Sequence, residues 1–321
     1  MTRTFVAALV VLAACTDSGP TYDYPKDDER TLFHVQSRGT HNSYHLEPPD
    51  NDVPEWMYSH DPLDVQLSNG VRQFELDVNV NVFDDRFEVY HFIRADEETT
   101  CHEFVECLRV MKRWSDANRG HHPFAVMIEI KDTYDPNYAD HFFELFETEL
   151  ESVWPRDRLV TPDLVRGDHA TLKEAVATDG WPTLGELRGR ALFFLLGSDD
   201  NDAHYTSNHT TLAGRLAFVD APIDMPYAAV TKVDNPISGS AELTAALNAG
   251  MLVRTRIDAD STSGPMVDQT RFDAALQIGA HFLSSDAVGV TIPGGSPSRC
   301  NPVTAPADCQ AIELEDPAFV D

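Results

Sequence analysis

Two histidines, one asparagine and three carboxylates stand at the ends of short apolar segments of the sequence. They are His41, Asn42, Glu75, Asp77, His91 and Glu129. Three carboxylates and an amide oxygen form a hard, oxygen-only ligand set that suits Ca²⁺, and zinc held by the two histidines is the less favoured alternative. Histidine is the side chain whose ordinary chemistry suits proton transfer near neutral pH, so the pair could serve as an acid and a base. One such residue alone would be an ordinary ion-pair partner, but six after four successive segments indicate a site.

Further charged residues follow the same segments. Lys131 and Arg256 are expected at strand ends close to the site, where each could hold a phosphate or form an ion pair. Asp286 ends the last predicted strand and could bind a hydroxyl group or cap the next segment. His121 and His122 precede a predicted strand, so we expect them in a solvated loop at the opposite end of the sheet.

The segments that must position these residues alternate between strand and helix patterns. Strands are predicted at residues 33–37, 73–78, 87–91, 124–130, 191–196, 251–256 and 281–284. Helices are predicted at residues 62–69, 101–117, 138–152, 241–248 and 269–278. This alternation predicts an α/β fold built on a parallel sheet.

A single-domain (β/α)8 barrel of the TIM type, regular or distorted, suits the length of about 290 residues that follows the N-terminal segment. A doubly wound open sheet is the alternative, but no glycine-rich phosphate-binding motif follows the first strand. The carboxyl ends of barrel strands converge on one mouth, and Glu75 and Asp77, two residues apart, face the same side. Residues 154–190 and 197–236 are rich in Pro, Asp and Gly and are predicted to be long loops.

Several of these segments resemble the phosphatidylinositol-specific phospholipases C. The segment 39–44, Gly-Thr-His-Asn-Ser-Tyr, resembles the signature of their catalytic X-region barrel, and residues 75–77 resemble the family's Glu-x-Asp step on the second strand. His91 corresponds to the second histidine and Glu129 to the last acidic ligand. The chain has acids where calcium-independent bacterial members place a basic side chain, so it resembles the calcium-dependent branch. Phe92 departs from the glycine of many eukaryotic members.

The resemblance implies a calcium-dependent phosphodiesterase that cleaves phosphatidylinositol-type lipids to diacylglycerol and a (cyclic) inositol phosphate. A ring hydroxyl would attack the phosphorus, His41 would stabilise the charged phosphorane and His91 would protonate the leaving alkoxide. Either Glu75 or Glu129 could be the base, and bound Ca²⁺ would make the hydroxyl more acidic. The implied calcium ligands are Asn42, Glu75, Asp77 and Glu129.

Two other functions stay open. One is a calcium-binding surface barrel without significant catalysis, although such a protein would need neither His41 nor His91. The other is a phosphodiesterase for another glycerophospholipid headgroup. The sequence identifies neither the headgroup nor its phosphorylation state.

The N-terminus has the pattern of an export signal. Arg3 precedes an apolar run at 5–14, which is too short to span a bilayer and ends on Cys15. Leu-Ala-Ala-Cys resembles a bacterial lipobox, which implies a lipidated cysteine; an ordinary signal peptide with a chance cysteine is the alternative. We expect residues 1–14 to be a signal peptide, 15–30 a lipidated tether and 31–321 the barrel. The expected location is the outer membrane or cell surface of a bacterium.

Four further cysteines form two close pairs. The pairs are Cys101 with Cys107 and Cys300 with Cys309. Each pair could close a small loop as a disulfide, and oxidising compartments favour such bonds. The spacings fit zinc poorly, so two disulfides are predicted.

The charge balance limits the partners. With 24 Lys and Arg against 53 Asp and Glu, the formal net charge is −29, which argues against non-specific binding of nucleic acid and against docking on anionic lipid by a basic patch. The expected partners are a phospholipid substrate and a membrane reached through the lipid anchor, and the protein is expected to be a monomer.

Overall fold

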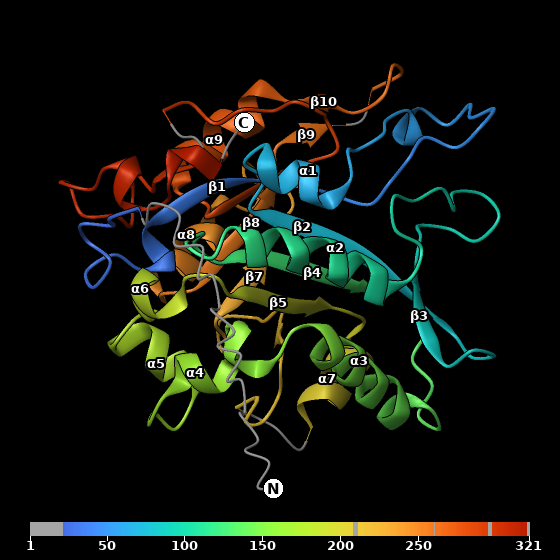
Figure 1. The fold of residues 1–321 in the computed structure, drawn as a ribbon, viewed down its shortest axis with the longest axis horizontal. Helices are drawn as coiled ribbons and strands as arrows, with labels where there is room; N and C mark the ends of the chain where they lie inside the picture. Colours follow the sequence, from blue (N-terminus) through green and yellow to red (C-terminus); the bar gives the residue numbers. More distant parts are fainter. Residues whose placement is uncertain (1–21, 208–210, 260, 295–296, 320–321) are drawn as a thin grey trace, which may run out of the picture.

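Parallel strands succeed one another around a barrel. The structure, a computed structural model, describes residues 22–207, 211–259, 261–294 and 297–319. The barrel strands are, in order, β1 (Val35–Thr40), β2 (Gln73–Asn81), β4 (Phe124–Ile130), β5 (Ala191–Leu196), β6 (Phe218–Val219), β7 (Val230–Lys232), β8 (Leu252–Arg256) and β11 (Phe282–Ser285). β11 pairs with β1, and an isolated bridge from Asp220 to Val230 links the end of β6 to β7. The predicted TIM-type α/β barrel is confirmed in a nearly closed form (Figure 1).

Helices pack around the strands. They are α1 (Leu63–Ser68), α2 (Phe104–Ala117), α3 (Ala139–Val153), α4 (Pro162–Arg166), α5 (Leu172–Thr178), α6 (Leu184–Leu187), α7 (Asp199–Thr206), α8 (Ser240–Asn248) and α9 (Gln269–Ile278). In α2, Phe104, Leu108 and Met111 recur at helical spacing and are fully buried in the core, which fixes the face that it turns to the barrel. Among the described residues, no helix is both long enough and apolar enough to cross a bilayer.

The segment predicted as the third barrel strand lies outside the barrel. β3 (Arg86–Val89) pairs antiparallel with the far end of β2, so that Val78 lies opposite Val89. β2 runs beyond the sheet, and a short turn ending at Asp85, whose φ is 53°, reverses the chain. Figure 1 shows β2 leading out toward β3 at the right of the view. The prediction of a parallel strand was therefore wrong, and His91 reaches the mouth from a hairpin.

Both segments predicted as long loops contain regular elements. Residues 154–190 hold α4, α5 and α6, and each of these helices begins after a threonine whose hydroxyl accepts a backbone N–H: Thr161, Thr171 and Thr183. Residues 197–236 hold α7 and two barrel strands of two and three residues. Elements this short show no hydrophobic period, which is why the sequence pattern missed them.

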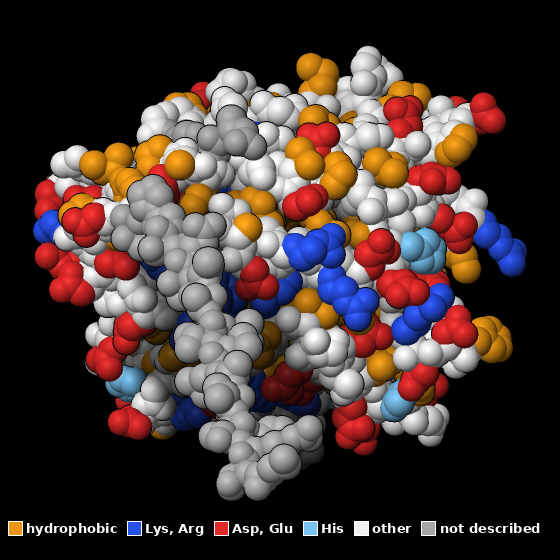
Figure 2. Space-filling model, viewed as in Figure 1, with side chains coloured by type: hydrophobic (Ala, Val, Ile, Leu, Met, Phe, Trp, Pro, Cys, Tyr) orange, Lys and Arg blue, Asp and Glu red, His pale blue; other side chains and the backbone are white. Residues whose placement is uncertain are grey.

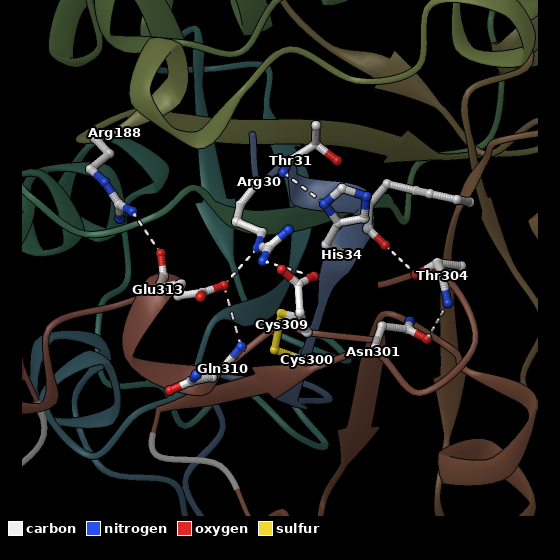
Figure 3. The surroundings of a disulfide bond; sticks show 12 residues. Arg30, Thr31, His34, Arg188, Cys300, Asn301, Thr304, Cys309, Gln310 and Glu313 are labelled. Atoms are coloured by element: carbon white, nitrogen blue, oxygen red, sulfur yellow. Dashed lines mark hydrogen bonds and ion pairs between the residues drawn. A yellow bond between two sulfur atoms is a disulfide. The ribbon is translucent and has the colours of Figure 1, made fainter. Parts of the chain in front are cut away.

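The far end of the chain packs against β1. β12 (Ser298–Cys300) pairs antiparallel with β1, and both predicted disulfides are present, Cys101–Cys107 and Cys300–Cys309. Figure 3 shows Arg30 beside the second disulfide with its guanidinium turned to Glu313; its Nε lies 2.6 Å from Oε2 of Glu313. A separate two-stranded ribbon joins β9 (Asp258–Ala259) to β10 (Met266–Val267).

His121 and His122 are buried, so the expectation of a solvated loop was wrong. His122 lies 2.8 Å from the Ser298 hydroxyl through Nε2, and its backbone N–H donates to Glu315. Arg72 donates to the same carboxylate at 2.6 Å. The C-terminal segment covers this end of the barrel, which a reading of local sequence could not show.

The acidic residues are spread over the surface. On the face in Figure 2, acidic side chains lie scattered among basic and apolar ones. The first described residues also pack on the barrel, because Arg188 lies 3.3 Å from the centre of the Tyr24 ring and bonds Asp27 through Nε. Cys15 and residues 1–21 lie outside the described residues.

Candidate active site

Three carboxylates meet at the mouth of the barrel, as the sequence predicts. Glu75 and Asp77 come from β2, and Asp77 lies in register with Glu129 on the neighbouring strand β4. One oxygen from each of the three lies within 4.8 Å of the others. The two-residue alternation of a strand turns Glu75 and Asp77 to one side, and the parallel pairing brings Glu129 beside them.

Two cations of the chain itself partner these carboxylates. The Lys131 Nζ lies 3.1 Å from Oδ2 of Asp77 and 3.1 Å from Oε1 of Glu129. Arg254, on β8, is fully buried and donates to Oε2 of Glu75 at 2.7 Å, while its other nitrogen contacts Asp234. Lys131 and Arg254 are thus the counter-ions of this acidic cluster.

Burial and mutual repulsion set the protonation of this cluster. Desolvation and the charge of Glu129 raise the pKa of Asp77 to about 8, although Lys131 opposes the rise. Burial would also raise the pKa of Glu129, but Lys131 outweighs it and lowers that pKa. Both carboxylate oxygens of Asp77 are buried without a hydrogen bond of normal geometry. Buried oxygens lacking such bonds, in an all-oxygen donor set, fit Ca²⁺ well.

His41 directly follows β1 and is fixed by two carboxylates. Its Nδ1 lies 2.7 Å from Oδ1 of Asp286, and its Nε2 lies 3.5 Å from Oε1 of Glu75. Desolvation would lower the pKa of His41, but Asp286 and Glu75 together outweigh it and raise the pKa above its usual value. The imidazolium form is therefore favoured at this position.

Asp286 is itself held on its second oxygen and on its backbone. Arg256 donates to Oδ2 of Asp286 at 2.8 Å and to Asp258 at 3.0 Å, and the Asp286 N–H donates to Asp258. Burial would raise the pKa of Asp286, but His41 and Arg256 hold it well below its usual range. Arg256 and Lys131 both form ion pairs, and in the structure Asp286 positions His41.

Asn42 is buried beside His41. Its backbone is left-handed, with φ of 40°, a conformation that asparagine tolerates better than most residues. The Tyr58 hydroxyl interacts with both Asn42 and Asp286, so the amide belongs to the same corner of the mouth.

His91 is held by a separate carboxylate. Its Nδ1 lies 2.8 Å from Oδ2 of Asp96, whose other oxygen lies 2.9 Å from Nε2 of His45. Burial would raise the pKa of Asp96, but these two hydrogen bonds lower it. The His91 ring packs on Phe92 with centroids 4.1 Å apart, and Lys131 lies 5.2 Å from the centre of the Phe92 ring. Phe92 thus contacts His91 on one hand and lies near Lys131, the counter-ion of the carboxylate cluster, on the other.

Sequence reasoning missed Arg254 and Asp96. Arg254 shares a face of β8 with Arg256, and the alternation of that strand could have found it. Asp96 follows His91 in a loop without periodic pattern, so nothing in the sequence marks it as the partner of His91.

A family model described as phosphoinositide phospholipase C, Ca²⁺-dependent, matches residues 31–88 and 81–302 in two overlapping stretches. These stretches cover most of the chain, including every residue of the mouth described above. Direct comparison with curated protein sequences finds no match.

Solved structures share the fold. A Ca²⁺-dependent phosphatidylinositol-specific phospholipase C from Streptomyces antibioticus is 21% identical over 80% of this chain and 95% of its own, with a TM-score of 0.63. A calcium-dependent phosphoinositol-specific phospholipase C from a Gram-negative Pseudomonas species is 17% identical over 87% of this chain and 98% of its own, with a TM-score of 0.65. Its myoinositol complex is 16% identical over 83% of this chain and 94% of its own, with a TM-score of 0.62.

Proposed function

The chain belongs to the Ca²⁺-dependent phosphoinositide phospholipase C family, and from this premise we propose that it cleaves phosphatidylinositol-type lipids to diacylglycerol and an inositol phosphate, cyclic or open. The observation that carries the proposal is the barrel mouth, where the carboxylate cluster meets His41 and where His91 stands just beyond Phe92. Each histidine is oriented by an aspartate of its own.

His41 is the residue that stabilises charge on the phosphorane. The Asp286 carboxylate accepts a hydrogen bond from Nδ1–H, and Asp286 and Glu75 together raise the pKa of His41, which favours a proton on Nε2 as well. An imidazolium N–H near the phosphorus can donate to an oxygen that gains charge in the transition state.

His91 is the general acid. A carboxylate can only accept, so the Nδ1 of His91 donates to Asp96 and leaves Nε2 for the substrate. Protonation of the diacylglycerol oxygen as it leaves avoids release of a free alkoxide. The proton of the attacking ring hydroxyl passes to Glu75 or Glu129.

Glu75, Asp77 and Glu129, with Asn42, would hold calcium. The bound ion supplies positive charge that makes the ring hydroxyl more acidic. Lys131 pairs with Glu129 and Arg256 with Asp286 beside the cluster, and both are proposed as partners of the substrate phosphate in the complex.

Large apolar side chains around the mouth support a lipid substrate. Ile93 and Phe92, next to His91, are 65% and 48% exposed. Exposed apolar groups of this size, close to a reaction centre, favour contact with a membrane surface.

The function is tested by headgroup release from vesicles of phosphatidylinositol, of its phosphorylated forms and from glycerophosphoinositol. Phosphatidylinositol should yield diacylglycerol and an inositol phosphate, and His41→Ala should abolish turnover while calcium still binds. Calcium binding without turnover on any of these substrates would favour a calcium-binding surface barrel instead. Turnover confined to another glycerophospholipid would reassign the headgroup.

We also propose that the protein is exported and anchored through a lipid on Cys15. The two disulfides support an oxidising compartment. Mass spectrometry of the mature protein should find Cys15 as an acylated N-terminal residue, and a mature chain that begins elsewhere would refute the anchor.

A further inference from the structure

We propose that Lys131 is a tethered cation that occupies the calcium position between Asp77 and Glu129 and leaves it when calcium binds. The inference rests on the proposed function, because it assigns calcium to this cluster. It adds that the chain carries its own competitor for the ion, so that Lys131 lowers the affinity for calcium.

The position of the ammonium group carries the inference. Lys131 immediately follows β4, two residues after Glu129, so both side chains leave the strand on one face. Its Nζ is equidistant, at 3.1 Å, from an oxygen of Asp77 and an oxygen of Glu129. Those two residues supply ligand atoms of the cluster, so the ammonium group occupies the position that a divalent ion would take.

The two cations exclude each other. Calcium binds carboxylate oxygens at about 2.3 to 2.6 Å, so an ion on these same oxygens would lie almost in contact with the ammonium group. Like charges at such a separation in a partly buried site repel strongly. Calcium binding therefore has to break both ion pairs of Lys131.

The Lys131 side chain can move away from the carboxylates, whereas the Arg254 side chain cannot. The Lys131 side chain is 17% exposed and ends a flexible four-carbon stem, whereas Arg254 is fully buried and bridges Glu75 to Asp234. The Phe92 ring, 5.2 Å from Nζ, offers a face on which a displaced ammonium can rest. Phe92 adjoins His91, so the displaced charge would move toward the leaving group of the substrate.

The test is calorimetric titration of calcium into wild type, Lys131→Met and a matched control, Lys112→Met. Lys112 lies on α2 and its side chain is similarly exposed, at 16%. It forms an ion pair with Asp116, and its Nζ lies 5.6 Å from the centre of the Trp154 ring. Lys131→Met should bind calcium about tenfold more tightly or better, because the competing charge is gone. Lys112→Met should bind calcium with the affinity of the wild type. Lys131→Arg keeps the competing charge, so its calcium affinity should not rise.

Thermal unfolding gives a second readout that does not depend on activity. In chelator, Lys131→Met should melt below wild type, because Asp77 and Glu129 lose their counter-ion. Excess calcium should close that gap, since the ion then neutralises Asp77 and Glu129 in both proteins. A gap that persists in calcium would indicate a structural ion pair and would overturn the inference.

The outcomes separate this inference from the function on which it rests. Equal or weaker calcium binding by Lys131→Met, beside measurable binding by wild type, overturns the role of Lys131 and leaves the calcium site intact. Binding by Lys131→Met alone would show that calcium does not displace the lysine in the wild type, and would overturn the inference. Binding by neither protein overturns the inference together with the calcium site.

Discussion

Asp286 is the residue that orients His41. It accepts from His41 and Arg256 at once and is not one of the clustered carboxylates. The sequence left its role open between a hydroxyl-binding group and a cap, because a predicted barrel brings the last strand to the first but does not show which side chains meet there. Pairing of these two strands brings the residues together.

We predict that Asp286→Asn reduces kcat by about a hundredfold or more, a typical loss when a proton-handling group is misoriented. The amide cannot stabilise the imidazolium as a carboxylate does. Calcium affinity, measured by calorimetry, should stay within a few-fold of wild type. A variant with unchanged kcat would show that Asp286 does not position His41.

The loss of turnover in a His91 variant should be larger when the leaving group of the substrate is more basic. His91→Ala should lose most turnover of phosphatidylinositol, whose alkoxide needs a proton, by about two to four orders of magnitude. An analogue with a thiol or phenol leaving group needs little protonation, so the variant should retain much more of its wild-type rate. An equal loss on both substrates would refute the assignment of His91 as general acid.

At the scale of elements, the sequence was informative where a segment was long and regular. The bounds of β4, β5 and α9 agree with the predicted ranges, because each presents a full apolar run or a complete helical period. β6 and β7 are too short to show a period, and β3 has the alternation of a strand whichever way it pairs. Strand direction depends on tertiary pairing. This explains why the sequence indicated the residues that meet at the mouth but not that His91 follows an antiparallel hairpin strand.

Gly39 shows why the first strand needs a glycine two residues before His41. A Cβ at this position would lie 2.9 Å from the Gln73 Cβ and closer still to its amide, because β1 and β2 meet where Gly39 pairs with Gln73. Gln73 is fully buried and has little room to move.

Gly39→Ala should therefore destabilise the fold by about 1 to 3 kcal/mol, the usual cost of overpacking. It should also lower turnover, because β1 carries His41. Urea unfolding and the headgroup assay measure the two effects. A variant as stable as wild type would mean that the strands can separate without cost.

At the scale of the whole molecule, buried histidines should make the protein sensitive to acid. Burial lowers the pKa of His121 to about 4 and that of His281 to about 3. The unfolded chain takes up protons on these residues below pH 6.5, whereas the fold does not until the lower values are reached. Stability therefore falls as the pH falls through this window, by roughly 2 to 3 kcal/mol for each histidine at pH 4.5.

His281→Gln isolates this contribution, because glutamine does not titrate. The variant should be less stable than wild type at pH 7, since His281 bonds the backbone of Phe33 and Val253. It should nevertheless lose less stability than wild type between pH 7 and pH 5 in urea unfolding. Parallel losses in the two proteins would show that His281 does not contribute to the acid sensitivity.

The most direct test of the account is inositol phosphate release from phosphatidylinositol vesicles by the wild-type protein, first in chelator and then with an ion restored. Under the proposed mechanism, calcium held by the clustered carboxylates activates the ring hydroxyl, so turnover should vanish in chelator and return with Ca²⁺. Mg²⁺ should restore it poorly, since that ion demands a tight octahedral shell and releases its waters reluctantly. Full turnover in chelator would contradict the calcium mechanism at this site.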